Sequence, residues 1–225
     1  MGLYYHEQTR ILVSVDCIIF GLNRGELSLL IIKRNLEPEK GKWSLMGGFV
    51  QENESLDEAA RRVLMELTGL RDVYMEQVGA FGAPDRDPGE RVISVAYYAL
   101  INFDDQDASL EREHNAKWIK LNEIPPLGFD HPLMIKKAMS RLRRKFSLEP
   151  IVFNLLPEYF TLSQLQSLYE TILGEPVDKR NFRKRIAEMR CIEKTDLIDK
   201  TTSRRGASLY KFNNSIYESD KKFNL

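Results

Sequence analysis

Three positions, 63, 66 and 67, are spaced so that their side chains would project from the same side of one predicted helix. Glutamates at all three could hold a divalent cation such as Mg²⁺, which prefers oxygen ligands and can polarise a phosphoryl group and activate water. The sequence instead has Val63, Glu66 and Leu67. A single carboxylate between two aliphatic side chains is a poor metal site. We therefore expect no metal ion, no cofactor and no catalytic residue.

The residues around these positions predict a helix that is entered through a glycine turn. Ser55 followed by Glu58 is a capping-box pattern, which satisfies free N–H groups at a helix start. Glu54 and Arg62 are placed to form an ion pair between the loop and the helix. Apolar residues recur at helical spacing, as expected of a stripe that packs on a core: Leu56, Ala60, Val63 and Leu67.

The stretch 48–70 resembles the Nudix box, Gly-x5-Glu-x7-Arg-Glu-hydrophobic-x-Glu-Glu-x-Gly-hydrophobic. Val63 and Leu67 stand where that family carries glutamates. The resemblance implies a Nudix fold, and the two departures predict a domain that senses a small molecule without cleaving it. The alternative is an active Mg²⁺-dependent Nudix hydrolase of nucleoside diphosphate derivatives such as ADP-ribose, with Glu54, Glu66 and an acid from residues 85–87 as metal ligands. The matching positions are Gly48, Glu54, Arg62, Leu64, Glu66, Gly69 and Leu70.

Composition places the chain among globular proteins. It has 225 residues, 43% of them hydrophobic, enough for one large or two ordinary domains with a sizeable core. Cys17 and Cys191 are its only cysteines, and no Cys/His spacing is typical of a zinc site. The N-terminus lacks the features of a signal peptide, and no apolar run reaches the roughly 18 residues of a membrane span. We expect a cytoplasmic protein with no membrane contact.

Runs rich in Val, Ile and Leu predict strands of a central sheet, and Pro132 suits the first turn of a following helix. The strands are expected at 11–22, 26–34, 73–81, 92–102 and 116–121, and the helix at 133–145. The turn-rich stretch 82–91 is expected to form a loop at the mouth of a ligand pocket. The predicted effector pocket is lined by Arg34, Trp43, Phe49, Glu66, Asp85, Arg86 and Asp87. Trp43 could stack on a ligand ring or pack beneath the loop, and His131 is expected to cap or pack.

A domain boundary is expected at Glu149-Pro150, which divides a Nudix-like ligand-sensing domain, 1–149, from a winged helix DNA-binding domain, 150–225. Beyond it the pattern predicts a helix closed by Gly174, a second helix at 179–190 with Asp178 as N-cap, and two strands around a basic tip. That order is typical of a winged helix-turn-helix. The fold class is therefore α+β, with a Nudix-type mixed sheet between helices and a C-terminal winged helix-turn-helix domain.

The second of these helices has the pattern of a DNA recognition helix. Although the formal net charge of the chain is zero, residues 179–211 carry eleven basic and four acidic side chains. Phe182, Ile186 and Met189 share one face and would anchor the helix. The predicted contacts to a double-stranded DNA operator are Arg180, Asn181, Arg183 and Lys184 on the helix, with Arg204 and Arg205 on the wing. A basic surface helix without a partner, an RNA-binding role and a protein-docking module remain open alternatives.

Both halves together resemble the Nudix-related transcriptional regulators of the NrtR-like family. The most specific segments are Arg86-Asp87-Pro88, Phe129-Asp130-His131, and the stretches 156–162 and 173–183. The resemblance implies homodimers that bind palindromic operators and release or rebind them when a small-molecule effector occupies the Nudix pocket. Some members respond to ADP-ribose and others to sugars, including arabinose. The aliphatic residues Val63 and Leu67 favour a neutral ligand, and hence the arabinose-responsive branch.

Overall fold

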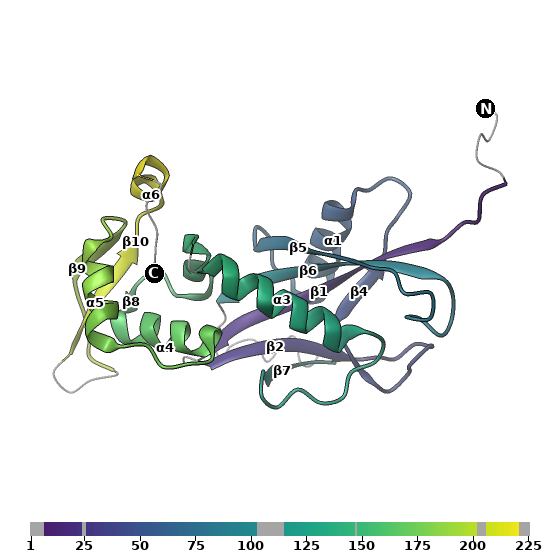
Figure 1. The fold of residues 1–225 in the computed structure, drawn as a ribbon, viewed down its shortest axis with the longest axis horizontal. Coiled ribbons are helices and arrows are strands. Elements are labelled where there is room, and N and C mark those ends of the chain that lie inside the picture. Colours follow the sequence, from purple (N-terminus) through teal and green to yellow (C-terminus); the bar gives the residue numbers. More distant parts are fainter. Residues whose placement is uncertain (1–6, 24–25, 103–114, 147, 202–205, 221–225) are drawn as a thin grey trace.

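The computed structural model of the chain describes residues 7–23, 26–102, 115–146, 148–201 and 206–220 (Figure 1). The N-terminal half, up to Phe146, is a mixed sheet, and its described residues place α1 on one face and α3 on the other. Its elements are β1 (Leu12–Asn23), β2 (Glu26–Lys33), β3 (Trp43–Ser44), β4 (Met46–Phe49), α1 (Leu56–Thr68), β5 (Tyr74–Phe81), β6 (Val92–Asn102), β7 (Ala116–Lys120) and α3 (His131–Phe146). The predicted strands and helices of this half are confirmed.

Strand β1 is the centre of the sheet. It runs parallel to β6 and antiparallel to β2 and β4, and the strand order is β3-β2-β1-β6-β5. Because side chains alternate along a strand, β1 supplies two cores. Ile18 and Phe20 belong to the core beneath α3, whereas Cys17 and Ile19 belong to the core beneath α1. Both helices are therefore fixed relative to the same strand.

The C-terminal half, from Leu148, has the winged helix arrangement that the sequence predicted. Its elements are a 3₁₀ helix η1 (Pro150–Leu155), β8 (Phe160–Thr161), α4 (Leu162–Leu173), α5 (Lys179–Glu188), β9 (Ile192–Asp199), β10 (Ala207–Phe212) and α6 (Asn214–Asp220). Helix α4 begins at a capping box formed by Thr161 and Gln164 and ends at Gly174, whose φ of 80° suits glycine. The three strands pair in the order β8-β10-β9.

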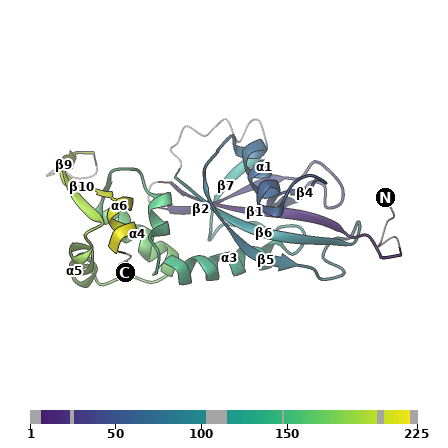
Figure 2. The ribbon, with the colours of Figure 1, turned by 90° about the horizontal axis from the view of Figure 1, so that it is seen from above.

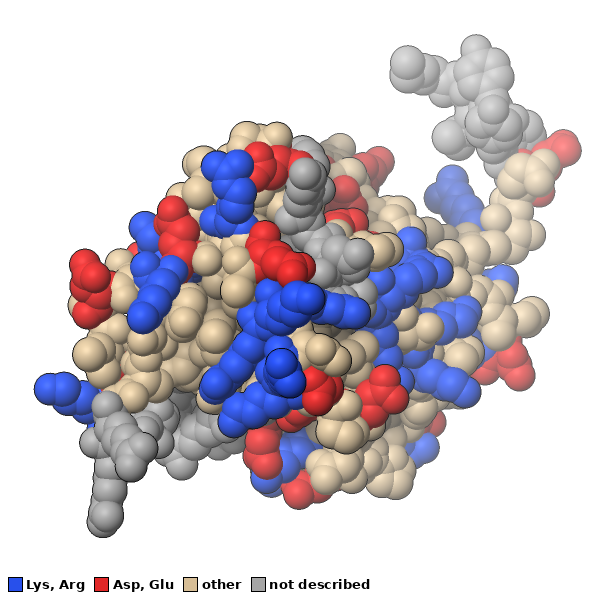
Figure 3. Space-filling model, turned by 60° about the vertical axis from the view of Figure 1, so that its left-hand side comes forward, with Lys and Arg blue, Asp and Glu red and all other residues tan. Residues whose placement is uncertain are grey.

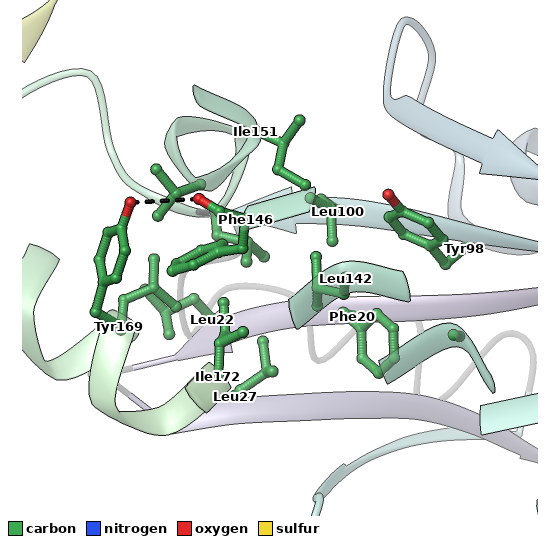
Figure 4. Close-up of a cluster of buried hydrophobic side chains, with 14 of the residues drawn as sticks. Phe20, Leu22, Leu27, Tyr98, Leu100, Leu142, Phe146, Ile151, Tyr169 and Ile172 are labelled. Atoms are coloured by element: carbon green, nitrogen blue, oxygen red, sulfur yellow. Dashed lines mark hydrogen bonds between the residues drawn. The ribbon is translucent and has the colours of Figure 1, made fainter. Parts of the chain in front are cut away.

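The two halves share one apolar core. Phe146, the last residue of α3, packs on Tyr169 of α4 with ring centroids 4.2 Å apart, and the Tyr169 hydroxyl donates to the Phe146 carbonyl (Figure 4). Leu22 and Ile172 belong to the same buried cluster. The expected boundary residue, Pro150, is the first residue of η1. No helix formed by the described residues is long and apolar enough to cross a membrane.

Candidate functional site

Helix α1 is held at its start by the residues that the sequence singled out. Ser55 and Glu58 form a reciprocal capping box, in which each side chain accepts from the other residue's N–H. Arg62 then ties the helix to the preceding loop, because it donates to both carboxylate oxygens of Glu54, at 2.6 and 2.9 Å, and to the Phe49 carbonyl at 3.0 Å. The hydrogen bonds from Arg62 lower the pKa of Glu54 to about 2. The predicted ion pair is confirmed.

The described carboxylates of this region are not grouped as the ligands of a metal ion would be. The Val63 side chain is 1% exposed and lies against Gly48, and Leu67 packs partly buried in the core beneath α1. Glu66 is exposed and faces Arg62 at 3.4 Å. Among the described residues, no three His, Cys, Asp or Glu side chains are grouped closely enough to hold a metal ion. The residues present do not fit a catalytic divalent cation, and we assign no step to one.

A buried group of charged and polar side chains lies around Asp16 in β1. Asp16 accepts a hydrogen bond from the Ser94 hydroxyl at 2.5 Å and faces Arg86 at 3.6 Å and His131 Nε2 at 3.5 Å. The Leu45 N–H donates to His131 Nδ1 at 3.1 Å, so Nε2 carries the proton that faces Asp16. Burial acts to raise the pKa of Asp16, but His131, Ser94 and Arg86 outweigh burial and hold this pKa below its usual value. His131 is thus a packing and hydrogen-bonding residue.

The predicted effector residues Arg34 and Trp43 each contact the segment 127–131, which leads into α3. The Trp43 carbonyl accepts from the Gly128 N–H at 2.9 Å, and Trp43 also packs partly buried against the core beneath α3. The Arg34 guanidinium lies over the Phe129 ring, 4.9 Å from its centre. Both Arg34 and Phe129 are half-buried, so a cation and an aromatic face lie together at the surface.

Arg86 reaches the same segment from the 82–91 loop, but its charge is already paired. Its side chain is 3% exposed, and Nη2 and Nε donate to the Asp130 carboxylate at 2.7 and 3.1 Å. With Asp16 on its other side, Arg86 joins the loop, β1 and the start of α3. Its geometry suits a residue that positions the predicted pocket.

The structure divides the remaining predicted effector residues between two places. Phe49, 56% exposed, and Glu66 both contact Arg62 in the middle of α1. Asp85 is exposed in the 82–91 loop, where Asp87 accepts from the Gly89 N–H at 2.8 Å. A separate hollow of about 330 Å³ between α1 and β5 includes none of the seven predicted residues in its lining. That lining consists of Arg61, Arg62, Leu64, Met65, Leu70, Arg71, Asp72, Val73 and Met75.

Phe129 and Asp16 lie at the site, although neither was among the residues predicted from the sequence to form it. Phe129 has a φ of 55°, a strained conformation for a bulky residue, and such strain is often stored at binding sites. Nothing in a hydrophobic pattern indicates a positive φ. Asp16 was detectable, because a carboxylate inside an apolar strand must find partners when it is buried.

Helix α5 presents its charges as the sequence predicted. Phe182 and Ile186 are buried on its inner face, at 5% and 2% exposure, and Met189 follows at 8%. The Asp178 side chain accepts from the Asn181 N–H at 2.7 Å and caps the helix. The predicted contact residues Arg180, Asn181, Arg183 and Lys184 are all exposed, as are the neighbouring Lys179 and Arg185, which were not predicted. The other two predicted contacts, Arg204 and Arg205, lie outside the described residues.

The two halves match two family models. The NUDIX domain model matches residues 10–139, and the model of the NrtR DNA-binding winged helix domain matches residues 152–212. A curated protein of Acinetobacter baylyi, the ADPR responsive transcriptional repressor NtrR, is 37% identical over 205 residues, which covers 89% of this chain and 82% of that protein. The alignment therefore spans most of both proteins.

Solved structures give the same result. The structure of Shewanella oneidensis NrtR complexed with a 27mer DNA aligns with a TM-score of 0.81 and 31% identity, covering 92% of this chain and 95% of that one. The NUDIX domain of the same protein complexed with ADP ribose aligns with a TM-score of 0.52 and 32% identity, covering 60% of this chain and 91% of that one.

Proposed function

This chain belongs to the NrtR-like transcriptional regulators, which join a Nudix domain to a DNA-binding winged helix, and we propose that it represses transcription until ADP-ribose binds its Nudix domain. In this proposal the Nudix domain, residues 1–149, senses the effector, and the winged helix domain, 150–225, binds an operator as part of a homodimer. The observation that carries the proposal is helix α5, which buries Phe182 and Ile186 and exposes consecutive basic and amide side chains.

The choice of ADP-ribose rests on the relatives and on the charges near segment 127–131. The related repressor is named for its response to ADPR, and a related Nudix domain was solved with ADP ribose. The arabinose-responsive branch expected from Val63 and Leu67 has no such support. Because Val63 and Leu67 pack in the core beneath α1, their apolar character says little about ligand polarity. Arg34 over Phe129 suits a ligand with a phosphate and a flat ring.

We infer that the Nudix domain binds its effector without hydrolysing it. Glu54 is held by Arg62, Glu66 is exposed beside the same arginine, and Val63 and Leu67 offer no oxygen. ADP-ribose incubated with this protein and Mg²⁺ should remain intact. The Glu66→Gln variant should give the same result. Release of AMP that Glu66→Gln abolishes would instead establish the hydrolase alternative.

For an effector to control DNA binding, it must bind one geometry of the dimer more tightly than the other, since equal affinity shifts no equilibrium. The shared core between α3 and α4 supports a direct mechanical link between the two halves. In this proposal ADP-ribose favours the geometry in which the two α5 helices of the dimer no longer match the spacing of the half-sites.

The deciding experiment selects bound duplexes from a random DNA pool, with the purified protein alone, with ADP-ribose and with arabinose. We expect a palindrome to be enriched, and to be lost with ADP-ribose but not with arabinose. Arg180→Ala should weaken binding to that palindrome by about 1–3 kcal/mol if Arg180 contacts a base. Failure to enrich any duplex, or enrichment that is insensitive to ADP-ribose, would overturn the corresponding half of the proposal.

A further inference from the structure

Helix α3 carries charges of one sign only. Its sixteen residues include six lysines and arginines and no aspartate or glutamate. The whole chain, by contrast, has 33 basic and 33 acidic residues. Surface helices ordinarily mix both signs, and a large field of one sign indicates a partner of the opposite charge.

Two of these six cations form ion pairs within the protein. Lys145 Nζ lies 2.6 Å from the Glu76 carboxylate, and Arg141 Nε lies 3.5 Å from it. Arg141 also donates to the Val78 carbonyl at 2.5 Å. These contacts hold α3 against strand β5, and they account for one side of the helix.

The other four cations, Lys136, Lys137, Arg143 and Arg144, are exposed on the outward side of α3. None of them forms an ion pair with another described residue, although Lys137 lies over the Phe81 ring. At 1.5 Å of rise per residue they span about 12 Å along the helix. Four cations at this spacing, without an ion-pair partner among the described residues, suit a polyanion better than a single small ion.

This outward face adjoins the predicted recognition helix. Arg143 Nε donates to the Ile172 carbonyl at 2.7 Å, and the Arg143 guanidinium lies against Gly174, in the turn that leads to α5. Figures 1 and 2 show α3 and α5 along the same side of the molecule. In Figure 3 Lys and Arg side chains gather in the middle of the face that is turned forward and continue toward its right-hand side.

We propose that the outward face of α3, formed by Lys136, Lys137, Arg143 and Arg144, binds the sugar-phosphate backbone of the same duplex that α5 reads. The proposal rests on the DNA-binding function proposed above. A protein partner fits this face poorly, because Leu133 at its N-terminal end is the one large exposed hydrophobic residue that the described part of α3 offers. Phosphate contacts of this kind add affinity without sequence preference.

The test compares two matched double variants in DNA titrations at several salt concentrations. Lys136→Gln with Lys137→Gln removes two charges from the α3 face, and Lys117→Gln with Lys120→Gln removes two from β7, which lies on the opposite side in Figure 2. We expect the α3 variant to reduce the slope of log K against log salt by about 1.8 per protomer. Its affinity for operator and for unrelated duplex should fall by the same factor, and this loss should shrink as the salt concentration rises. The β7 variant should bind like the wild type.

Several outcomes would overturn the proposal. If the α3 variant kept the wild-type salt slope while Arg180→Ala still lost operator binding, the α3 contact would be rejected. The proposed function would then remain intact. A loss confined to the operator sequence would reject a backbone contact, and a change of dimer mass in sedimentation would indicate a protein interface instead. If the wild-type protein bound no duplex at all, the proposed function itself would fail.

Arg144→Gln is a second variant, which leaves the Lys137 contact with Phe81 in place and should lower the slope by about 0.9 per protomer.

Discussion

Arg62 and Glu54 connect helix α1 to the loop before it, and this connection depends on pH. Arg62 holds both oxygens of the Glu54 carboxylate, and the pKa of Glu54 is lowered from 4.5 to about 2. A carboxyl whose pKa is lower in the folded state stabilises that state above its unfolded pKa, and the stabilisation is lost as pH falls toward the folded value. The relevant window is therefore pH 4.5 to about 2.

We predict that Glu54→Gln removes this pH-dependent contribution. The free energy of unfolding, measured by urea titration at several pH values, should be lower in the variant than in the wild type by a constant amount above pH 5. The difference should shrink as pH falls from about 4.5 toward 2, because the wild-type carboxyl becomes protonated in that range. A difference that stays constant down to pH 2 would show that the ion pair contributes no proton linkage.

Sequence reasoning predicted the Glu54–Arg62 pair but missed the buried group around Asp16. The first pair lies within one short loop-helix segment, so its two members are close in sequence and the turn into α1 brings them together. The partners of Asp16 come from three distant segments, as Ser94, Arg86 and His131, and only the packed sheet brings them together. Charge patterns along the chain do not reveal partners of this kind.

Helix α5 depends on the cap at its start. It is ten residues long, and within it only Phe182 and Ile186 are buried. A helix this short is marginal by propensity, so its start must be fixed by side-chain hydrogen bonds and packing. Asp178 provides that start through the Asn181 N–H.

We predict that Asp178→Ala destabilises the protein by about 1 kcal/mol, because one N–H at the start of α5 loses its acceptor. Asp178→Asn is the matched control and should cost less, since its amide oxygen can still accept. Thermal unfolding measures the stability, and operator titration should show weaker DNA binding for the alanine variant. Equal stability of the two variants would mean that packing of Phe182 and Ile186 alone fixes the helix.

Element boundaries were predictable where caps mark them. Gly174 ends α4 as expected, and Thr161, to which no cap was assigned from the sequence, begins it. Helix α5 ends at Glu188, two residues before the expected Arg190, because Met189 adopts extended backbone. The short strands β3 and β4 were not predicted. They contain few residues and have no alternating pattern, and they exist because they pair with β2 and β1.

At the scale of the whole molecule, the apolar core continues from the sheet into the winged helix. Leu22 and Leu27, at the β1–β2 hairpin, belong to one cluster with Phe146 of α3 and with Tyr169 and Ile172 of α4. Two halves joined in this way should unfold together. Sequence patterns suggested two separate domains, because each half has its own periodicity and the contacts between them leave no periodic signal.

We predict one cooperative unfolding transition, with equal calorimetric and van't Hoff enthalpies. Phe146→Ala should lower stability by about 3–5 kcal/mol, since it leaves a cavity between the halves. Phe49→Ala, at a position 56% exposed, is the control and should change stability by less than about 0.5 kcal/mol. Two resolved transitions in scanning calorimetry of the wild type would contradict the shared core.

This continuous core also limits how the protein can be divided or recombined. A cut before Pro150 would leave Leu22, Leu27 and Phe146 facing water, and the released C-terminal piece would expose Tyr169 and Ile172. We therefore expect each piece on its own to be less stable than the same residues in the whole chain. A design that keeps only one half would need polar residues at the apolar positions that the cut exposes, because those positions now serve both halves.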